Sequence, residues 1–253
     1  MILLPLSSLC AKSPSANLTT FVGLPAEQFL TGKFDPEKNA NFVCINDIGI
    51  PTDGRKHYLQ KTAAENLKNL INDFNKDYPS IKLYVCSSTR NFNNQKRIWE
   101  GKWNGSTLVS GKNLSLEISN PEKRALEILK FSSMPGTSRH HWGTDVDFNE
   151  LVNSYYTKGE GKIIYVWLNE NAYKYGFFQP YTADRSQGYS EEKWHWSFVP
   201  LSKIYYWTWL ELFGKNESQL NSLKFVGSEF SLKFATIFVQ SVNEDCYNKD
   251  IEK

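Results

Sequence analysis

Two short segments of this chain carry the residue types that bind a metal ion and activate water. Residues 138–147 have the sequence SRHHWGTDVD, and residues 192–195 have the sequence EKWH. Together they hold three of the four histidines in the chain. Two imidazoles and one carboxylate form a ligand set that zinc prefers at catalytic sites, where a fourth position is left for water. The two segments therefore predict a catalytic metal site.

Glu192 precedes His195 by three residues, so the sequence places a second carboxylate beside the predicted metal. Zinc lowers the pKa of bound water towards ~7, and a neighbouring carboxylate accepts the proton and passes it to a leaving amine. Each motif alone is weak, because a lone histidine is more often structural and Asp145 with Asp147 could form a turn or a calcium-like cluster. Their conjunction in this order favours the metal site.

The same residues resemble the signatures of a known family. The first segment is similar to SxHxxGxxxD and the second to ExWH, both typical of the D-alanyl-D-alanine carboxypeptidase (VanY-like) family of zinc metallopeptidases. The resemblance implies that His140, Asp147 and His195 bind one zinc ion and that Glu192 is the catalytic base. His140 and Asp147 are seven residues apart and His195 follows 48 residues later, which suits the order of the family.

A third element, residues 87–95 with the sequence SSTRNFNNQ, resembles the S-G-x-R-[ST]-x-x-x-Q stretch of that family. The resemblance implies that Arg90 is a catalytic and substrate-facing cation and that Gln95 is a supporting polar contact. An arginine near a metal stabilises an oxyanion or binds a carboxylate through two parallel hydrogen bonds. Ser138 is expected to hydrogen-bond substrate, with a role in shaping the turn as the alternative.

The chain departs from the family pattern at two positions. Ser88 stands at the glycine of the arginine motif, and Asp145 stands where the family often has a small residue. We expect Asp145 to lie near the metal or to bind a substrate nitrogen. His57 lies in a turn rich in Gly, Arg and Lys, so we expect it at the surface. His141 could contact substrate or lie at the surface, and the sequence does not decide between these positions.

For several aromatic residues the sequence does not decide between a place in the cleft and a place in the core. Trp142, Trp194 and Trp196 could form a wall of the cleft or pack in the core, and Tyr181 is a further candidate for the cleft.

The composition argues against two classes of partner. The net charge is +2, from 29 basic and 27 acidic residues without a basic run, which argues against nucleic acid. No stretch approaches the ~20 apolar residues that cross a bilayer.

The apolar residues 1–9 resemble an incomplete export signal. We expect a monomer outside the cytoplasm, with a lipid anchor on Cys10 and a disordered N-terminus as alternatives.

The spacing of apolar residues predicts the elements around these motifs. Period-three-to-four patterns predict helices, and alternation predicts a strand over 193–199, with Trp194, Trp196 and Phe198 on one face. The other predicted strands cover 41–45 and 82–86, and residues 133–149 are predicted to form a loop that leads into a strand. The predicted helices cover 58–78, 93–103, 121–130, 162–175 and 231–242. The absence of a βαβ rhythm favours an α+β fold with an antiparallel sheet. The resemblance implies a hedgehog/D-Ala-D-Ala peptidase-like fold, a small antiparallel sheet flanked by helices.

We expect a leader or linker over 1–25, a zinc peptidase domain over 26–215, and a C-terminal helical extension over 216–253. Cys10, Cys44, Cys86 and Cys246 form no CxxC pair and lie apart from the histidines, so a thiolate metal site is not expected. A disulfide between two of them is left open.

The resemblance implies hydrolysis of the D-Ala–D-Ala bond, or a related bond, in a peptidoglycan stem peptide or muropeptide. One alternative is an endopeptidase that cuts inside the stem peptide. Another is a dipeptidase in which Asp145 binds the amino group of the substrate. A third is a non-catalytic zinc-bearing module that binds wall peptides, and Glu192 argues against it because a structural zinc site needs no general base.

Overall fold

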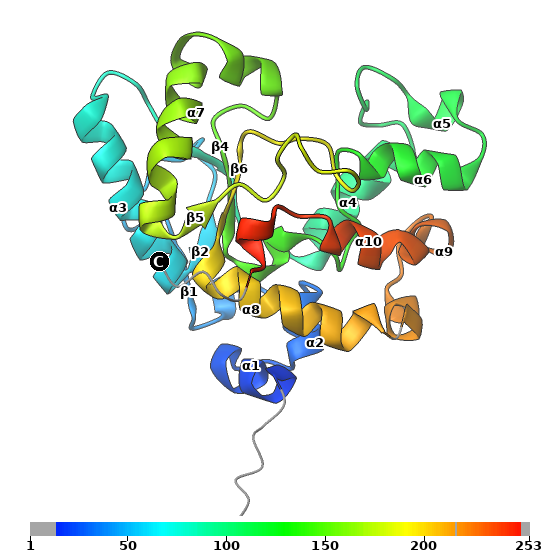
Figure 1. The fold of residues 1–253 in the computed structure, drawn as a ribbon. Coiled ribbons are helices and arrows are strands. Elements are labelled where there is room, and N and C mark those ends of the chain that lie inside the picture. The colour runs from blue at the N-terminus through cyan, green and yellow to red at the C-terminus, as the bar shows by residue number, and fades with distance from the viewer. Residues whose placement is uncertain (1–13, 216, 249–253) are drawn as a thin grey trace, which may run out of the picture.

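A four-stranded antiparallel sheet lies at the centre of the protein and carries residues of both predicted metal-binding motifs (Figure 1). The computed structural model describes residues 14–215 and 217–248. The strands are β1 (Phe42–Cys44), β2 (Tyr58–Gln60), β3 (Val85–Ser87), β4 (Asp145–Phe148), β5 (Phe177–Phe178) and β6 (His195–Phe198). The strand order is β3-β4-β6-β5, and β1 and β2 form a separate hairpin-like pair. The α+β prediction with a small antiparallel sheet is confirmed.

Helices and short helical turns surround the sheets. The α-helices are α1 (Pro14–Val22), α2 (Ala26–Leu30), α3 (Lys61–Asp77), α4 (Phe92–Trp103), α5 (Leu114–Glu117), α6 (Pro121–Leu129), α7 (Gly159–Asn171), α8 (Val199–Trp209), α9 (Ser228–Ser231) and α10 (Ala235–Gln240). The 3-10 turns are η1 (Pro36–Lys38), η2 (Arg139–Trp142), η3 (Asn153–Thr157), η4 (Ala172–Tyr175), η6 (Glu217–Ser222), η7 (Leu232–Phe234) and η8 (Glu244–Cys246), and η5 (Leu210–Gly214) is a π-helical turn.

The central sheet has one apolar face and one polar face. Val146 and Phe148 of β4 pack with Trp196 and Phe198 of β6 in a core that α3 and α7 cover. Because side chains alternate along a strand, the intervening residues of β4 and β6 turn to the other face. The predicted alternation around residues 195–198 is thereby confirmed for Trp196 and Phe198.

A second apolar core lies beside the polar face and is built from α1, α2, α4, α6, α8 and the C-terminal helices. Helix α8 had no predicted counterpart, because it is apolar on most sides and lacks the single stripe that marks an amphipathic helix. Its polar tips are partnered inside this core: Tyr205 Oη donates to Gln60 Oε1 at 3.0 Å, and Trp209 Nε1 donates to the Gly136 carbonyl at 3.1 Å.

Most predicted elements are found, and the differences lie at their ends. Residues 58–60, predicted as helix, are strand β2 and pair with β1. Helix α7 ends at Asn171, and the turn η4 follows it up to Gly176, whose φ of 77° gives a glycine cap. The single helix predicted over 231–242 is broken into α9, η7 and α10.

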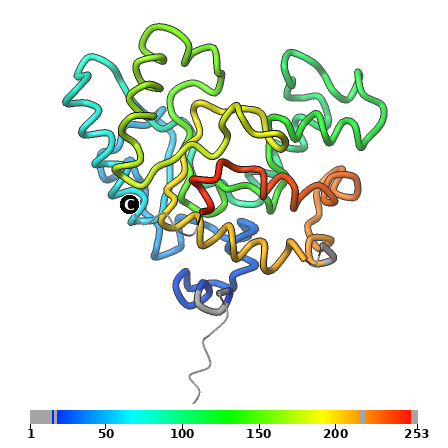
Figure 2. Tube along the Cα trace, in the orientation of Figure 1, coloured from blue at the N-terminus to red at the C-terminus, as the bar shows by residue number. Residues whose placement is uncertain are grey.

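The ends of the described chain pack on the rest of the molecule (Figure 2). Within the leader or linker expected over residues 1–25, helix α1 packs on the rest of the protein, because Leu18 and Val22 are buried in the second core. The C-terminal segment lies on the loop before β6, where the Asn243 N–H donates to the Pro180 carbonyl at 2.8 Å. The predicted domain boundaries at residues 25 and 215 stay predictions.

Two further expectations concern the cysteines and the membrane. Residues 1–9 and Cys10, the proposed export signal and lipid anchor, lie outside the described residues. Within the described part, Cys44, Cys86 and Cys246 are free thiols. No helix in residues 14–215 and 217–248 is long and apolar enough to cross a membrane.

Gly143, the residue that lets the chain turn from η2 into β4, provides a test of this packing. Its φ is 70°, and a Cβ there would lie 2.3 Å from Phe42 Cε1. We expect Gly143→Ala to lower the free energy of unfolding by about 2–4 kcal/mol, from left-handed strain and overpacking. Gly49, with φ of 80° and no atom within 4 Å of such a Cβ, is the control and should lose only about 1–2 kcal/mol. Urea denaturation measures both, and equal losses would contradict the packing argument.

Candidate metal centre

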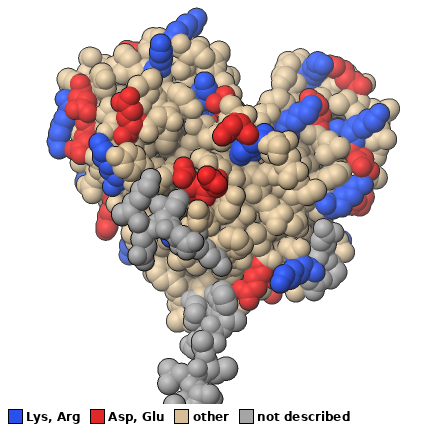
Figure 3. Space-filling view, viewed as in Figure 1, with Lys and Arg blue, Asp and Glu red and all other residues tan. Residues whose placement is uncertain are grey.

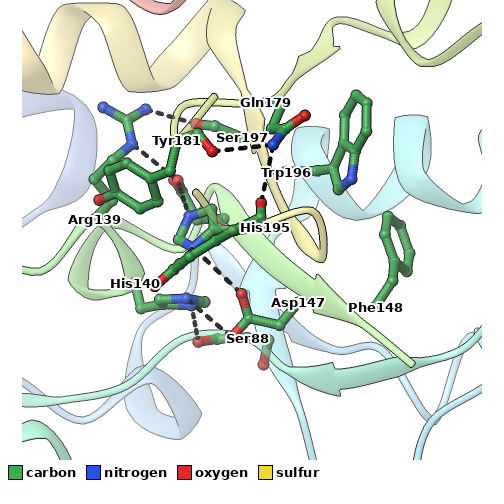
Figure 4. Close-up of polar contacts among 12 residues, drawn as sticks. Ser88, Arg139, His140, Asp147, Phe148, Gln179, Tyr181, His195, Trp196 and Ser197 are labelled. Carbon is green, nitrogen blue, oxygen red and sulfur yellow. Dashed lines mark hydrogen bonds and ion pairs between the residues drawn. The ribbon is translucent and has the colours of Figure 1, made fainter. Parts of the chain in front are cut away.

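The register of β4 and β6 brings two of the predicted ligands together. Asp147 of β4 lies opposite His195 of β6, and η2 supplies His140 from the residues just before β4. His140 Nε2 lies 3.3 Å from Asp147 Oδ2, and His195 Nδ1 lies 3.3 Å from Asp147 Oδ1. One potential ligand atom from each residue lies within 4.8 Å of the other two. Figure 4 shows the three side chains turned toward one another.

The arrangement of these atoms fits a zinc ion. Ligands at about 2.0–2.1 Å around a tetrahedral ion are about 3.3–3.4 Å apart, which is the spacing of both pairs. His140 Nε2 and Asp147 Oδ1 are buried and have no hydrogen-bond partner among the described residues. Because buried polar atoms without partners are rare and costly, their convergence supports a metal position between them.

The two histidines are held through their outer nitrogens by different acceptors. His140 Nδ1 donates to the Ser88 carbonyl at 2.8 Å, which leaves Nε2 free to face the metal position. His195 Nε2 lies 2.9 Å from Asp145 Oδ1, which leaves Nδ1 for the metal. A partner of this kind sets the tautomer and the orientation of a ligating histidine.

Asp145 contacts His195 and so lies near the metal position, one of the two places expected for it, and its substrate contact stays a prediction. The residue is fully buried and does not line the cavity at the metal position. Oδ1 also accepts from Arg139 Nε at 2.9 Å, and Oδ2 accepts from Thr144 Oγ1 at 2.6 Å. Asp145 and Asp147 lie on the same polar face of β4. Asp145 pairs with Ser197 rather than with His195, and it contacts the side of the His195 ring that faces away from the metal position.

The charges of the cluster favour a cation at the metal position. Burial lowers the pKa of His195, but hydrogen bonds to Asp145 and Glu192 outweigh it and raise the pKa to about 9. Burial alone would raise the pKa of Asp147, yet the two histidines hold it below its usual range. Burial and the Arg90 charge lower the pKa of His140, so this ring is neutral at neutral pH, whereas His195 releases a proton when a metal binds.

A cavity of about 690 Å³ opens over the cluster and is lined by its three residues together with Arg90, Gln95 and Glu192. Its walls come from α4, from the loops before and after β4, and from the loop before β6. Figure 3 shows the surface hollowed between the part with α7 and the part with α5 and α6. Glu192 Oε2 lies 3.3 Å from His195 Nδ1. The predicted base and cation therefore share one cavity with the candidate ligands.

Backbone and side-chain contacts hold these cavity residues in place. The Glu192 N–H donates to the Tyr181 carbonyl at 2.9 Å, and the Arg90 N–H donates to the His140 carbonyl at 2.9 Å. Gln95 Nε2 donates to the Ser133 carbonyl at 2.7 Å. Arg90 Nε and Gln95 Oε1 are buried without a partner among the described residues, so both have hydrogen-bonding capacity for a ligand.

The remaining candidates divide between cavity and core. Tyr181 and Trp194 line the cavity, whereas Trp142 and Trp196 are core residues. Ser138 is buried outside the residues that line the cavity, and its substrate contact stays a prediction.

His141, which the sequence left between a substrate contact and the surface, is buried. Its Nδ1 donates to the Arg90 carbonyl at 2.6 Å, and its Nε2 accepts the Gly136 N–H at 2.9 Å. The residue therefore links the arginine motif to the turn before η2.

His57, expected at the surface, is buried behind the site. Its Nδ1 lies 3.1 Å from Ser88 Oγ and its Nε2 lies 3.0 Å from Asp53 Oδ1, and Asp53 is paired with Arg55. This chain of contacts anchors Ser88, whose carbonyl holds His140. The spacing of Asp53 and His57 in the sequence offered no signal for it, because Ser88 comes from a distant segment.

The Asp145–Arg139 pair yields a test of how His195 is held. Asp145→Ala alone would leave the Arg139 guanidinium buried and unpaired, a loss of about 3–5 kcal/mol. We therefore combine it with Arg139→Met, which removes both charges. The zinc dissociation constant should rise about 10- to 100-fold, since the outer partner of His195 is gone.

Competition with a chromophoric chelator measures this constant. The control is Lys233→Met combined with Glu122→Ala, which removes an exposed ion pair of 2.6 Å that does not line the cavity. Equal zinc affinities in both double variants would overturn the supporting role of Asp145.

The sequence matches the family model described as VanY, D-alanyl-D-alanine carboxypeptidase, over residues 56–201, more than half of the chain. A D-alanyl-D-alanine carboxypeptidase of Enterococcus faecalis is 38% identical over 80 residues, 29% of this chain and 28% of that protein. The putative carboxypeptidase YodJ of Bacillus subtilis is 29% identical over 180 residues, 67% of this chain and 56% of that protein. The chain thus spans less than two thirds of the length of either relative.

Several solved structures are similar at low identity, among them the following two. The LdcB LD-carboxypeptidase is 21% identical with a TM-score of 0.49, over 77% of this chain and 82% of that chain. The vancomycin resistance D,D-pentapeptidase VanY, solved with Zn(II), is 21% identical with a TM-score of 0.46, over 72% and 88%. The family match spans the arginine motif, η2, β4 and β6. The chain belongs to the VanY family of D-alanyl-D-alanine carboxypeptidases.

Proposed function

We propose that the chain is a zinc-dependent carboxypeptidase that hydrolyses the D-Ala–D-Ala bond, or a related bond, at the end of peptidoglycan stem peptides. The observation that carries this proposal is one cavity that holds a His–Asp–His cluster, a carboxylate and a guanidinium. Membership in the VanY family supports the class of substrate. Since peptidoglycan lies outside the cytoplasmic membrane, we also propose an extracytoplasmic site of action, with the protein acting as a monomer.

His140 Nε2, an Asp147 carboxylate oxygen and His195 Nδ1 would hold one zinc ion. The unpartnered buried atoms of this cluster and the 3.3 Å spacings support this assignment. When bound, zinc lowers the pKa of a water molecule towards ~7 and polarises a carbonyl group.

Glu192 would act as the general base. Its carboxylate, 3.3 Å from His195 Nδ1, would accept a proton from the attacking water and deliver it to the nitrogen of the leaving D-amino acid. Its main chain is held by the Tyr181 carbonyl and by Gln179, whose Nε2 donates to the Glu192 carbonyl at 3.1 Å. This anchoring limits the positions that the carboxylate can take.

Arg90 and Gln95 would bind the reacting part of the substrate. The Arg90 guanidinium carries an unpartnered buried Nε at the cavity, so it is available for the oxyanion or for a substrate carboxylate. Gln95 Oε1 would accept a hydrogen bond from a peptide N–H, because the amide nitrogen of Gln95 is already bound to the Ser133 carbonyl.

The burial of Asp145 bears on one alternative. A dipeptidase must bind the free amino group of its substrate, and Asp145 was the carboxylate considered for it. Asp145 is enclosed by Arg139, Thr144 and His195, so that argument for a dipeptidase is lost. The non-catalytic binding module is disfavoured because Glu192 lines the cavity beside the cluster.

Incubation with a pentapeptide-bearing muropeptide tests the proposal. We expect the zinc-loaded protein to release one terminal D-alanine, detected by mass spectrometry. A chelator should abolish this release, and added zinc should restore it. Cleavage inside the stem peptide would instead identify an endopeptidase, and an intact peptide would overturn the proposed activity.

Glu192→Gln separates the base from the metal site. We expect zinc content to remain at one ion per chain while kcat falls about 10²- to 10⁴-fold, the usual contribution of a general base. Glu191→Gln is the matched control, since Glu191 also lines the cavity but lies 4.0 Å from Lys193 Nζ. Elemental analysis and initial rates give both quantities. Full turnover by Glu192→Gln would refute the assignment.

A further inference from the structure

Helix α4 turns a second cation toward the cavity. Gln95, Ile98 and Lys102 all line it, and their spacing of three and four residues places them on one face of the helix. Lys102 lies seven residues beyond Gln95, which is about 10 Å along the helix axis. The α4 wall thus presents an amide at one end and an ammonium group at the other.

The Lys102 ammonium is held by neutral groups. Nζ donates to Ser132 Oγ at 2.5 Å and lies 3.5 Å from the Phe131 carbonyl oxygen. Across residues 14–215 and 217–248, no carboxylate lies within ion-pair distance of it. An ammonium group has three donors, so at least one donor of this charge has no partner within the described protein.

The charge of Lys102 and its neutral partners suit this position to an anion. The pKa of Lys102 is lowered to about 8, mainly by burial. The Arg90 charge lowers it further, and the Glu192 carboxylate acts in the opposite direction. The group is therefore mostly charged at neutral pH. Both cavity cations, Arg90 and Lys102, lack an ion-pair partner in the described chain, and a partly desolvated charge gains most from an ionic partner.

We propose that Lys102 binds a carboxylate group of the peptide substrate and makes the enzyme selective for peptides that carry it. This inference rests on the proposed peptidase function. The two carboxylates of a stem peptide that we compare are the C-terminal carboxylate and a side-chain carboxylate of the diamino acid. The Lys102 ammonium, with Ser132 beside it, donates to either one.

A purely structural role makes a different prediction. The Phe131 carbonyl follows the end of α6, and a lysine that binds such a carbonyl stabilises a helix end. Loss of that contact would lower the stability of the protein and would lower activity by the same factor with every peptide. Discrimination between substrates would then be unchanged. Discrimination is therefore the quantity to measure.

The test uses Lys102→Met, Lys102→Gln and Lys102→Arg with four stem peptides. The peptides end in a free acid or an amide, and their third residue is lysine or meso-diaminopimelate. Lys102→Gln keeps a donor for Ser132 and Phe131 without the charge, which guards against a folding defect in Lys102→Met. Lys68→Met, on the exposed face of α3, is the control, and Tm and zinc content are measured for each variant.

We expect Lys102→Met and Lys102→Gln to lose about 10- to 100-fold in kcat/KM with peptides that carry the recognised carboxylate, the usual effect of a charged hydrogen bond. Peptides without it should change less than about threefold, and Lys102→Arg should retain most of the preference. A loss confined to free acids assigns the C-terminal carboxylate, and one confined to diaminopimelate peptides assigns the side chain. Equal losses with all four peptides, or no loss, would overturn the inference.

A binding arm keeps this test independent of turnover. Dissociation constants of the four peptides are measured by calorimetry for zinc-loaded Glu192→Gln with and without Lys102→Met. If the wild type cleaves nothing but the carboxylate preference in binding depends on Lys102, the proposed hydrolysis fails and the inference stands. If no peptide binds, both are refuted.

Discussion

The antiparallel pairing of β4 with β6 is the constraint on which the rest of the site depends. It sets Asp147 opposite His195 and Asp145 opposite Ser197 on the polar face, while Val146 and Trp196 fill the core on the other face. A shift of one residue in this register would exchange the two faces and bury the ligands among apolar side chains. The apolar core under α3 and α7 therefore helps to set which residues of β4 and β6 face the candidate metal site.

The two histidines of the cluster are held by two different kinds of hydrogen-bond acceptor, and we call these contacts their supports. His140 donates to a neutral carbonyl, which the Ser88–His57–Asp53 contacts anchor. His195 meets a carboxylate, which Arg139 neutralises. A carboxylate partner makes an imidazole more basic than a carbonyl partner does, so the two histidines are unequal ligands. Ser88 and Asp145, the two positions at which the sequence motifs differ from the signatures that they resemble, both belong to these supports.

The floor and the walls of the cavity come from different parts of the fold. Its floor is the β4–β6 pair with η2, and its walls come from α4 and from loops such as the one that the C-terminal segment covers. Chemistry at the floor depends on the sheet, whereas the choice of peptide depends on the walls. A family can therefore keep one metal site while its members act on different bonds, and wall residues such as Lys102 are where this chain's own specificity is expected.

The sequence by itself determined what is local: the motifs, the alternation that places Trp196 and Phe198 in the core, and the amphipathic helices α3, α4 and α6. Tertiary structure decided which polar residues face the cavity. Asp145 is two residues from Asp147, yet it lies behind His195 because Arg139 and Thr144 enclose it. His57 is buried because Ser88, from a distant segment, meets it. Helices α1 and α8 escaped prediction because packing, rather than a periodic apolar face, stabilises them. Such contacts join residues far apart in the chain, and no local pattern encodes them.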